Sequence, residues 1–157
     1  MPLGRVPAQA CLWLLVAGMN PLPAADPGGR AEYVGGTVAA LAGTAGGVIL
    51  TTDQRYFEFR ARPATLRIAY EKINLLEYGQ KVDRRYALGI LVSPVLLLSK
   101  KRRHFLTIGY ADEEGRQQAM VFRVDKNHVR SVLASLEART GRRVEYQDEE
   151  ARKAGKG

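Results

Sequence analysis

The sequence has few of the residues that most often carry catalysis or hold metals. Its 157 residues include one cysteine, Cys11, and two histidines, His104 and His128. Cys11 lies at the start of an apolar N-terminal segment. A chain cleaved after that segment would contain no cysteine, and so neither a disulfide framework nor a cysteine-based metal site. Four basic residues precede His104, and their charge opposes a metal cation and favours a neutral imidazole. We therefore expect no metal ion and no cofactor.

Motifs of common enzyme families are also missing. There is no Gly-x-Ser-x-Gly elbow. The glycines between Gly35 and Gly47 have neither the spacing of a dinucleotide fingerprint nor the Gly-Lys-Ser/Thr end of a phosphate loop. Paired carboxylates can act as acid and base when burial separates their pKa values, but here they cluster at 112–114 and 148–150, in an expected turn and tail. The sequence thus predicts that the protein is not an enzyme, with an enzyme of unrecognised type as the alternative.

The N-terminal segment has the parts of a secretory signal peptide. Arg5 supplies a positive charge, Ala10–Met19 is an apolar run of suitable length, and Pro21–Ala25 ends in small residues. We interpret residues 1–25 as a signal peptide and expect an exported protein, whether periplasmic, envelope-associated or secreted. A disordered or wrongly assigned N-terminus is the alternative. The apolar run is too short to anchor the chain across a hydrocarbon core about 30 Å thick. The fourteen uncharged residues 86–99 are also too few for an ordinary transmembrane helix, so we expect no transmembrane span in the mature chain.

Strand patterns dominate the part of the chain that follows. Apolar and polar residues alternate at 56–61, 66–70, 104–111 and 117–125, and the last two segments flank an acidic turn ending in Gly115. Alternation with a period of two is typical of half-buried strands, and the turn makes the last pair a hairpin.

The pattern changes to a helical period near the C-terminus. Val129, Val132, Leu133 and Leu136 stand three and four residues apart, which predicts an amphipathic helix at about 127–140 that ends at Gly141. A short strand at 144–146 closes the domain. We expect one β-rich domain at 33–146, preceded by a flexible joint at 26–32 and followed by a charged, solvated tail at 147–157.

Strands first and a helix last indicate an α+β, mainly β architecture of antiparallel hairpins. The element order and the segment Arg67–Tyr78 (RIAYEKINLLEY) resemble the pleckstrin-homology-like fold, in particular its small bacterial variants. This resemblance implies a sheet or barrel closed by one C-terminal amphipathic helix. The segments 100–110 and 144–153 are similar to uncharacterised exported bacterial proteins, which implies a family without an assigned activity.

Positive charge is concentrated around one apolar run, Tyr86–Ser99. Between positions 81 and 103 the only acidic residue is Asp83. The segment therefore carries a net +6, out of +8 for the whole chain. We call the basic residues of this segment the basic rim: Lys81, Arg84, Arg85, Lys100, Lys101, Arg102 and Arg103.

Three interpretations of this block stay open. The apolar run is a buried core element with solvated charges at its ends, with Pro94 dividing it. Alternatively, it contacts an anionic membrane surface, where each basic residue contributes about 1 kcal/mol. In the third interpretation, Lys100–Arg103 neutralise the phosphates of a nucleic acid or another polyanion.

The sequence therefore predicts a non-enzymatic, exported binding module. Its expected partner is an anionic membrane surface or an envelope protein, met through the basic rim. A small polyanion-binding or nucleic-acid-binding protein is the alternative, although export keeps the chain away from cytosolic nucleic acid.

Export gives the first testable prediction. N-terminal sequencing of the protein recovered after cell fractionation should find a mature chain beginning near Asp26 in the envelope or the medium. An intact chain that begins at Met1 in the cytosol would contradict export and favour the polyanion-binding alternative.

Overall fold

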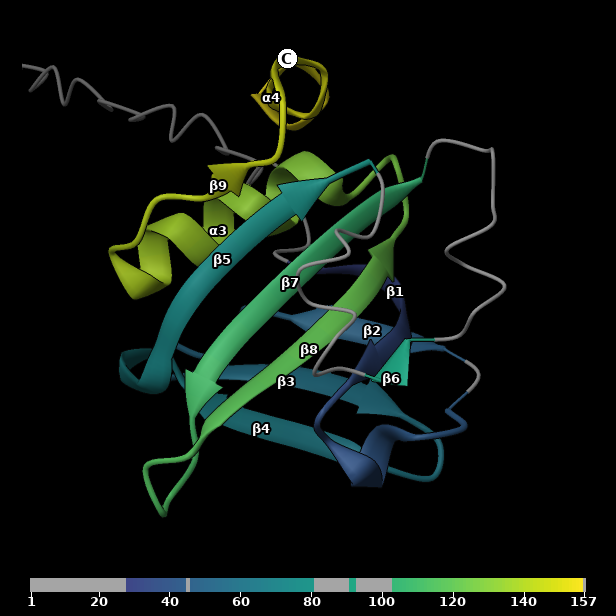
Figure 1. The fold of residues 1–157 in the computed structure, drawn as a ribbon, viewed down its shortest axis with the longest axis vertical. Coiled ribbons are helices and arrows are strands. Elements are labelled where there is room, and N and C mark those ends of the chain that lie inside the picture. Colours follow the sequence, from purple (N-terminus) through teal and green to yellow (C-terminus); the bar gives the residue numbers. More distant parts are fainter. Residues whose placement is uncertain (1–27, 45, 81–90, 93–102, 157) are drawn as a thin grey trace, which may run out of the picture.

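The computed structural model describes residues 28–44, 46–80, 91–92 and 103–156. Within them the fold is mainly β, with two α-helices in the C-terminal part (Figure 1). The elements in chain order are β1 (Gly28–Gly36), the 3-10 helix η1 (Ala39–Leu41), β2 (Gly47–Leu50), β3 (Tyr56–Ala61), β4 (Thr65–Ala69), the 3-10 helix η2 (Tyr70–Lys72), β5 (Ile73–Gly79), β6 (Leu91–Val92), β7 (His104–Ala111), β8 (Gln117–Val124), α3 (Val129–Thr140), β9 (Glu145–Tyr146) and α4 (Glu149–Lys156).

All described strands belong to one mixed sheet with the order β4-β3-β2-β1-β8-β7-β5-β9, and β6 pairs with β1 beside this path. Every pairing is antiparallel except that of β5 with β9. The sheet folds over so that β5, β7 and β8 form one layer and β2, β3 and β4 lie behind it (Figure 1). The strand that links the two layers is β1. Strand β1 pairs with β2 over Gly28–Ala31 and with β8 over Ala31–Gly36.

The core fills the space between the two layers. Phe122 of β8 lies at its centre, with ring centroids 5.9 Å from Tyr33, 6.1 Å from Phe57 and 4.8 Å from Phe59. Phe57, Phe59 and Phe122 are fully buried. The alternating pattern at 56–61 therefore predicts the correct buried face, because both phenylalanines point into the core.

Helix α3 covers one end of this core, as its apolar stripe predicts. The four residues Val129, Val132, Leu133 and Leu136 are all buried. The helix stops at Gly141, whose φ of 67° is the left-handed conformation that glycine adopts without steric cost. The N–H of Gly141 donates to the carbonyl of Glu137 at 2.9 Å, which closes the last turn.

Asx-type turns connect two of the hairpins. Asp53 accepts hydrogen bonds from the N–H groups of Arg55 and Tyr56 at 2.8 and 3.2 Å in the β2–β3 turn. Asp112 accepts from those of Glu114 and Arg116 at 3.0 and 2.8 Å in the β7–β8 turn. A short acidic side chain satisfies backbone donors that the tight turn leaves free, so both turns follow from local sequence. The hairpin predicted at 104–125 is confirmed.

Three expectations need correction at the ends of the domain. Residues 28–32, expected to be part of a flexible joint, form the first half of β1. Residues 149–156 form α4 instead of a solvated tail, because Ala151 and Gly155 are buried on one side of it. Two α-helices therefore follow the strands where one was expected.

Two further expectations are met only in part. Within the described residues the sheet is not closed, since its order runs from β4 at one end to β9 at the other. Of the apolar run Tyr86–Ser99, Leu91 and Val92 form β6, which pairs with Gly35–Gly36; the rest of the run lies outside the described residues. No helix in the described ranges is long and apolar enough to cross a membrane.

The central position of Phe122 gives a stability prediction. Replacing it with alanine (Phe122→Ala) should lower the free energy of unfolding by about 3–5 kcal/mol, because three aromatic neighbours lose their contact and a cavity remains. Urea unfolding followed by circular dichroism measures this. Val48→Ala, at a 39% exposed position of β2, is the control and should change stability by less than about 1 kcal/mol. Similar losses in the two variants would contradict the packing described.

Candidate functional site

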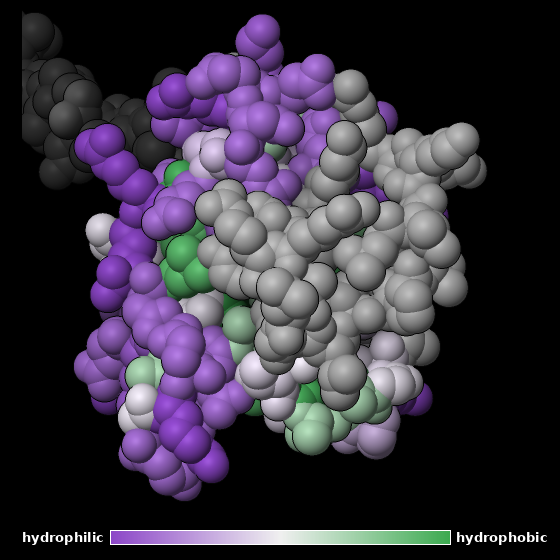
Figure 2. Space-filling model, in the orientation of Figure 1, coloured by the Kyte–Doolittle hydropathy of each residue, from purple (hydrophilic) through white to green (hydrophobic). Residues whose placement is uncertain are grey.

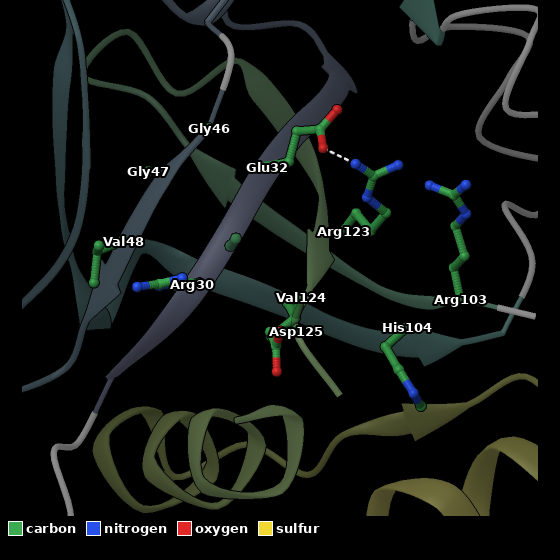
Figure 3. Close-up of a pocket in the computed structure, with 11 residues that line it drawn as sticks. Arg30, Glu32, Gly46, Gly47, Val48, Arg103, His104, Arg123, Val124 and Asp125 are labelled. Atoms are coloured by element: carbon green, nitrogen blue, oxygen red, sulfur yellow. Dashed lines mark hydrogen bonds and ion pairs between the residues drawn. The ribbon is translucent and has the colours of Figure 1, made fainter. Parts of the chain in front are cut away.

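An open groove of about 630 Å³ lies on the outer side of the sheet where β1 passes between β2 and β8 (Figure 3). Four strand segments line it: the middle of β1, the start of β2, the start of β7 and the end of β8. Its lining residues are Arg30, Ala31, Glu32, Gly46, Gly47, Val48, Arg103, His104, Arg123, Val124 and Asp125.

Strand register brings the charged residues of the groove to one face. Arg123 pairs with Glu32 on one side and with Phe105 on the other. Directly paired residues point to the same face of a sheet, and residues two apart on one strand share a face as well. Arg103 directly precedes β7 and lines the same groove as Arg123.

Three arginines meet two carboxylates in this groove. Arg123 and Glu32 form an ion pair, drawn as the dashed line in Figure 3, and about a third of each side chain is exposed. The guanidinium groups of Arg103 and Arg123 extend toward the same end of the groove in that view, whereas Arg30 points toward Val48. With the histidine neutral, the groove carries one positive charge more than negative.

The second carboxylate, Asp125, is hydrogen-bonded within the turn that precedes α3. Its side chain accepts a hydrogen bond from the N–H of Asn127 at 2.8 Å, and its own N–H donates to the carbonyl of Arg30 at 3.0 Å. The hydrogen bond from Asn127 lowers the pKa of Asp125, against a smaller opposing effect of desolvation, and the charges of His128 and Arg30 lower it further. Asp125 therefore stays ionised and anchors the backbone at the rim of the groove.

His104 lines the groove with its backbone, while its ring turns away from the arginines toward β9 and α4 (Figure 3). Its Nδ1 is hydrogen-bonded to the hydroxyl of Tyr78, a fully buried residue. Burial lowers the pKa of His104, and the charge of Lys126 lowers it further. The neutral imidazole expected from sequence is thus favoured, but burial is the main cause. Burial also raises the pKa of Tyr78 to about 12.

Of the basic rim, only Arg103 belongs to the described residues, and it lies in this groove. Lys81, Arg84, Arg85, Lys100, Lys101 and Arg102 lie outside them. Sequence reasoning missed Arg30, Arg123 and Glu32, which lie far from Arg103 along the chain. Only the pairing of β1 with β8 and of β8 with β7 brings them together.

The described surface is mainly hydrophilic in the view of Figure 2, with smaller hydrophobic areas between the hydrophilic ones. Val48, at the edge of the groove, is the one large hydrophobic residue of the described ranges that is exposed. Among the same residues there is no group of three or more histidine, cysteine or acidic side chains that could hold a metal ion.

Comparison of the chain with known protein families finds no matching family model, and comparison with curated proteins finds no match either.

The hydrogen bond between the half-buried His104 and the buried Tyr78 gives a pH-dependence prediction. Because the pKa of His104 is lower in the folded state than the value of about 6.5 in the unfolded chain, the unfolded chain binds a proton first as the pH falls. The free energy of unfolding should therefore decrease from pH 7 through pH 6.5 and below, until His104 is protonated in both states.

Replacing the histidine (His104→Phe) removes this contribution and should flatten the stability profile between pH 7 and pH 5. Urea unfolding at half-unit steps of pH measures both profiles. Equal slopes in the two proteins would show that His104 is not destabilised as an imidazolium in the folded state.

Proposed function

We propose that the protein is an exported, non-enzymatic binding module that contacts an anionic lipid surface through the groove and the neighbouring basic rim. The observation that carries this proposal is that Arg103, the last residue of the basic rim, shares one open groove with Arg30 and Arg123.

Arginine suits such a role because its planar guanidinium binds two phosphate oxygens at once and keeps its charge at any physiological pH. Arg30 is exposed and Arg103 half-buried, and neither has an ion pair with a described residue. Three further basic residues, 100–102, immediately precede Arg103 in the chain.

The exposed Val48 supports a membrane surface more than a soluble polyanion. It lies at the edge of the groove, and Arg30 and Arg60 are its register partners on the neighbouring strands. An apolar side chain among arginines fits the boundary between headgroups and acyl chains, where basic residues meet phosphates and apolar ones are removed from water.

A pleckstrin-homology-like architecture is part of the proposal. Its support is the strand order: a meander β1-β2-β3-β4, a second meander β5-β7-β8 that pairs back onto β1, and then a helix over one end of the core. This order resembles that of pleckstrin-homology-like domains, and on this proposal β6 is an added pairing on β1 and β9-α4 is a C-terminal extension.

Vesicle binding tests the function. The mature wild-type protein should co-sediment with vesicles containing phosphatidylglycerol and should bind neutral phosphatidylcholine vesicles weakly. The double variant Arg30→Ala/Arg103→Ala should bind the anionic vesicles about 30-fold more weakly, since each arginine contributes about 1 kcal/mol and 1.4 kcal/mol is a tenfold change.

The matched control is Arg62→Ala/Arg143→Ala, which removes the same charge at two exposed positions outside the groove. If both double variants lose the same affinity, binding depends on net charge and not on the groove. If the wild type binds neutral and anionic vesicles equally, the proposed function is wrong. A wild type that ignores vesicles but retards a polyanion in a gel would favour the alternative function.

A further inference from the structure

Strand β4 leaves one edge of the sheet without a partner strand among the described residues. It is the last strand at its end of the sheet order, whereas at the other end β9 pairs with β5 (Figure 1). An uncovered edge presents a row of backbone donors and acceptors to which another extended chain can pair. Thr65 and Arg67 of β4 are exposed, so this edge is accessible.

The pairing with β3 decides which backbone groups of β4 face outward. The N–H of Tyr70, next to the end of β4, donates to the carbonyl of Arg55 at 2.9 Å. Hydrogen-bonded pairs alternate with non-hydrogen-bonded pairs in an antiparallel ladder, so Leu66 and Ile68 form the hydrogen-bonded pairs with β3. The residues whose backbone N–H and C=O groups point away from β3 are therefore Thr65, Arg67 and Ala69.

A second groove, of about 460 Å³, runs beside this edge. One wall is Leu66–Ala69 of β4, and the other is Tyr110–Glu113, from the end of β7 and the turn that follows it. Ile68 is buried in the core and Leu66 packs against it. Side chains of an added strand that lie opposite these two residues turn to the same face of the sheet. The groove therefore offers backbone partners along one wall and, at alternate positions, a place for apolar side chains.

The charges of this groove favour one kind of occupant. Glu71 lines the groove, is exposed, and has no ion pair with a described residue. The other charged lining residues do have such partners: Lys72 with Glu113, Asp112 with Arg116, and Arg67 with Asp53. The uncompensated charge is therefore negative, and it repels an anionic surface and attracts a basic side chain.

A second copy of this chain fits the edge poorly. In a symmetric antiparallel pair that uses the whole edge, Arg67 is the middle residue and lies opposite its own counterpart. Like charges directly opposite each other destabilise a sheet. A segment of different sequence avoids this repulsion.

We propose that β4 binds one extended segment of a partner protein as an added antiparallel strand. In this mode backbone hydrogen bonds give affinity and alternate side chains give specificity. The residues of the segment opposite Leu66 and Ile68 are apolar. Its N-terminal end lies beside the end of β4, because the strands are antiparallel, and carries a basic residue that meets Glu71. This groove shares no residue with the arginine groove, so the inference does not depend on the proposed function.

A synthetic peptide tests the proposal. The probe is acetyl-Lys-Ser-Thr-Val-Thr-Ile-Thr-amide, titrated into the ¹⁵N-labelled protein and followed by NMR. In the register proposed, its valine lies opposite Ile68 and its isoleucine opposite Leu66. The backbone amide signals that should shift most are those of Thr65, Arg67 and Ala69.

Two doubly N-methylated versions of this peptide form a matched pair. Methylation of the two threonines that flank valine removes N–H groups that face β4, and binding should weaken at least about tenfold. Methylation of valine and isoleucine removes N–H groups that point away from β4, so this peptide should bind within about twofold of its parent.

Ala69→Pro tests the protein side of the same contact. Ala69 has a φ of −63°, which proline can adopt, and its N–H is not used by β3. The variant should therefore unfold at the same urea concentration as the wild type. It should bind the peptide about tenfold more weakly, because its ring removes one donor from the open edge.

Glu71→Gln tests the charge. It should bind the peptide about threefold more weakly, as expected for an exposed ion pair. It should match the wild type toward a peptide whose lysine is replaced by glutamine. Glu145→Gln, an exposed position on β9 at the other end of the sheet, is the control and should bind as the wild type does.

The outcomes separate this proposal from its alternatives. Silent β4 signals, or equal binding of the two methylated peptides, overturn it. Signals of β4 that shift with protein concentration alone assign the edge to a second copy, and displacement of the peptide by short-chain phosphatidylglycerol assigns it to lipid; both results contradict the proposal. Ala69→Pro should bind anionic vesicles like the wild type, so failure of either proposal leaves the other in place.

Discussion

The structure depends on one constraint: β1 belongs to both layers of the sheet. It pairs with β2 from Gly28 to Ala31 and with β8 from Ala31 to Gly36, and the register shifts between Tyr33 and Gly35. A single strand can serve two layers only if it bends, and a bulge at this point provides the bend. Phe122 and its aromatic neighbours fill the space that the bend encloses.

The same bend in β1 produces the groove on the outer side of the sheet. Residues of β1 alternate between the two sides, so that Ala31 packs in the core while Arg30 and Glu32 face outward. The outer side of the bend therefore gathers charged side chains from β1, β7 and β8. Evenly mixed charges would make an ordinary solvated surface. Here the arginines outnumber the carboxylates, and the Asp125 carboxylate is already hydrogen-bonded in the turn that precedes α3.

The sequence predicted β3, β4, β7, β8 and the helix α3, because the apolar residues of these segments recur along the sequence with a period of two or of 3.6. It failed at β1, since Gly28–Gly36 is rich in glycine and its bulge interrupts alternation. It failed at α4 because the buried face there consists of small residues, Ala151 and Gly155, that leave no apolar signal. The groove could not be predicted, because its arginines come together only through strand pairing between distant segments.

Anion recognition in the groove can be tested separately at each arginine side chain. We suggest a titration of ¹⁵N-labelled protein with short-chain phosphatidic acid, following the Nε–Hε signals of the arginine side chains by NMR. We expect the signals of Arg30, Arg103 and Arg123 to shift together and saturate with one affinity, while those of Arg62 and Arg143 do not move. Shifts spread evenly over all arginines, or confined to those outside the groove, would contradict it.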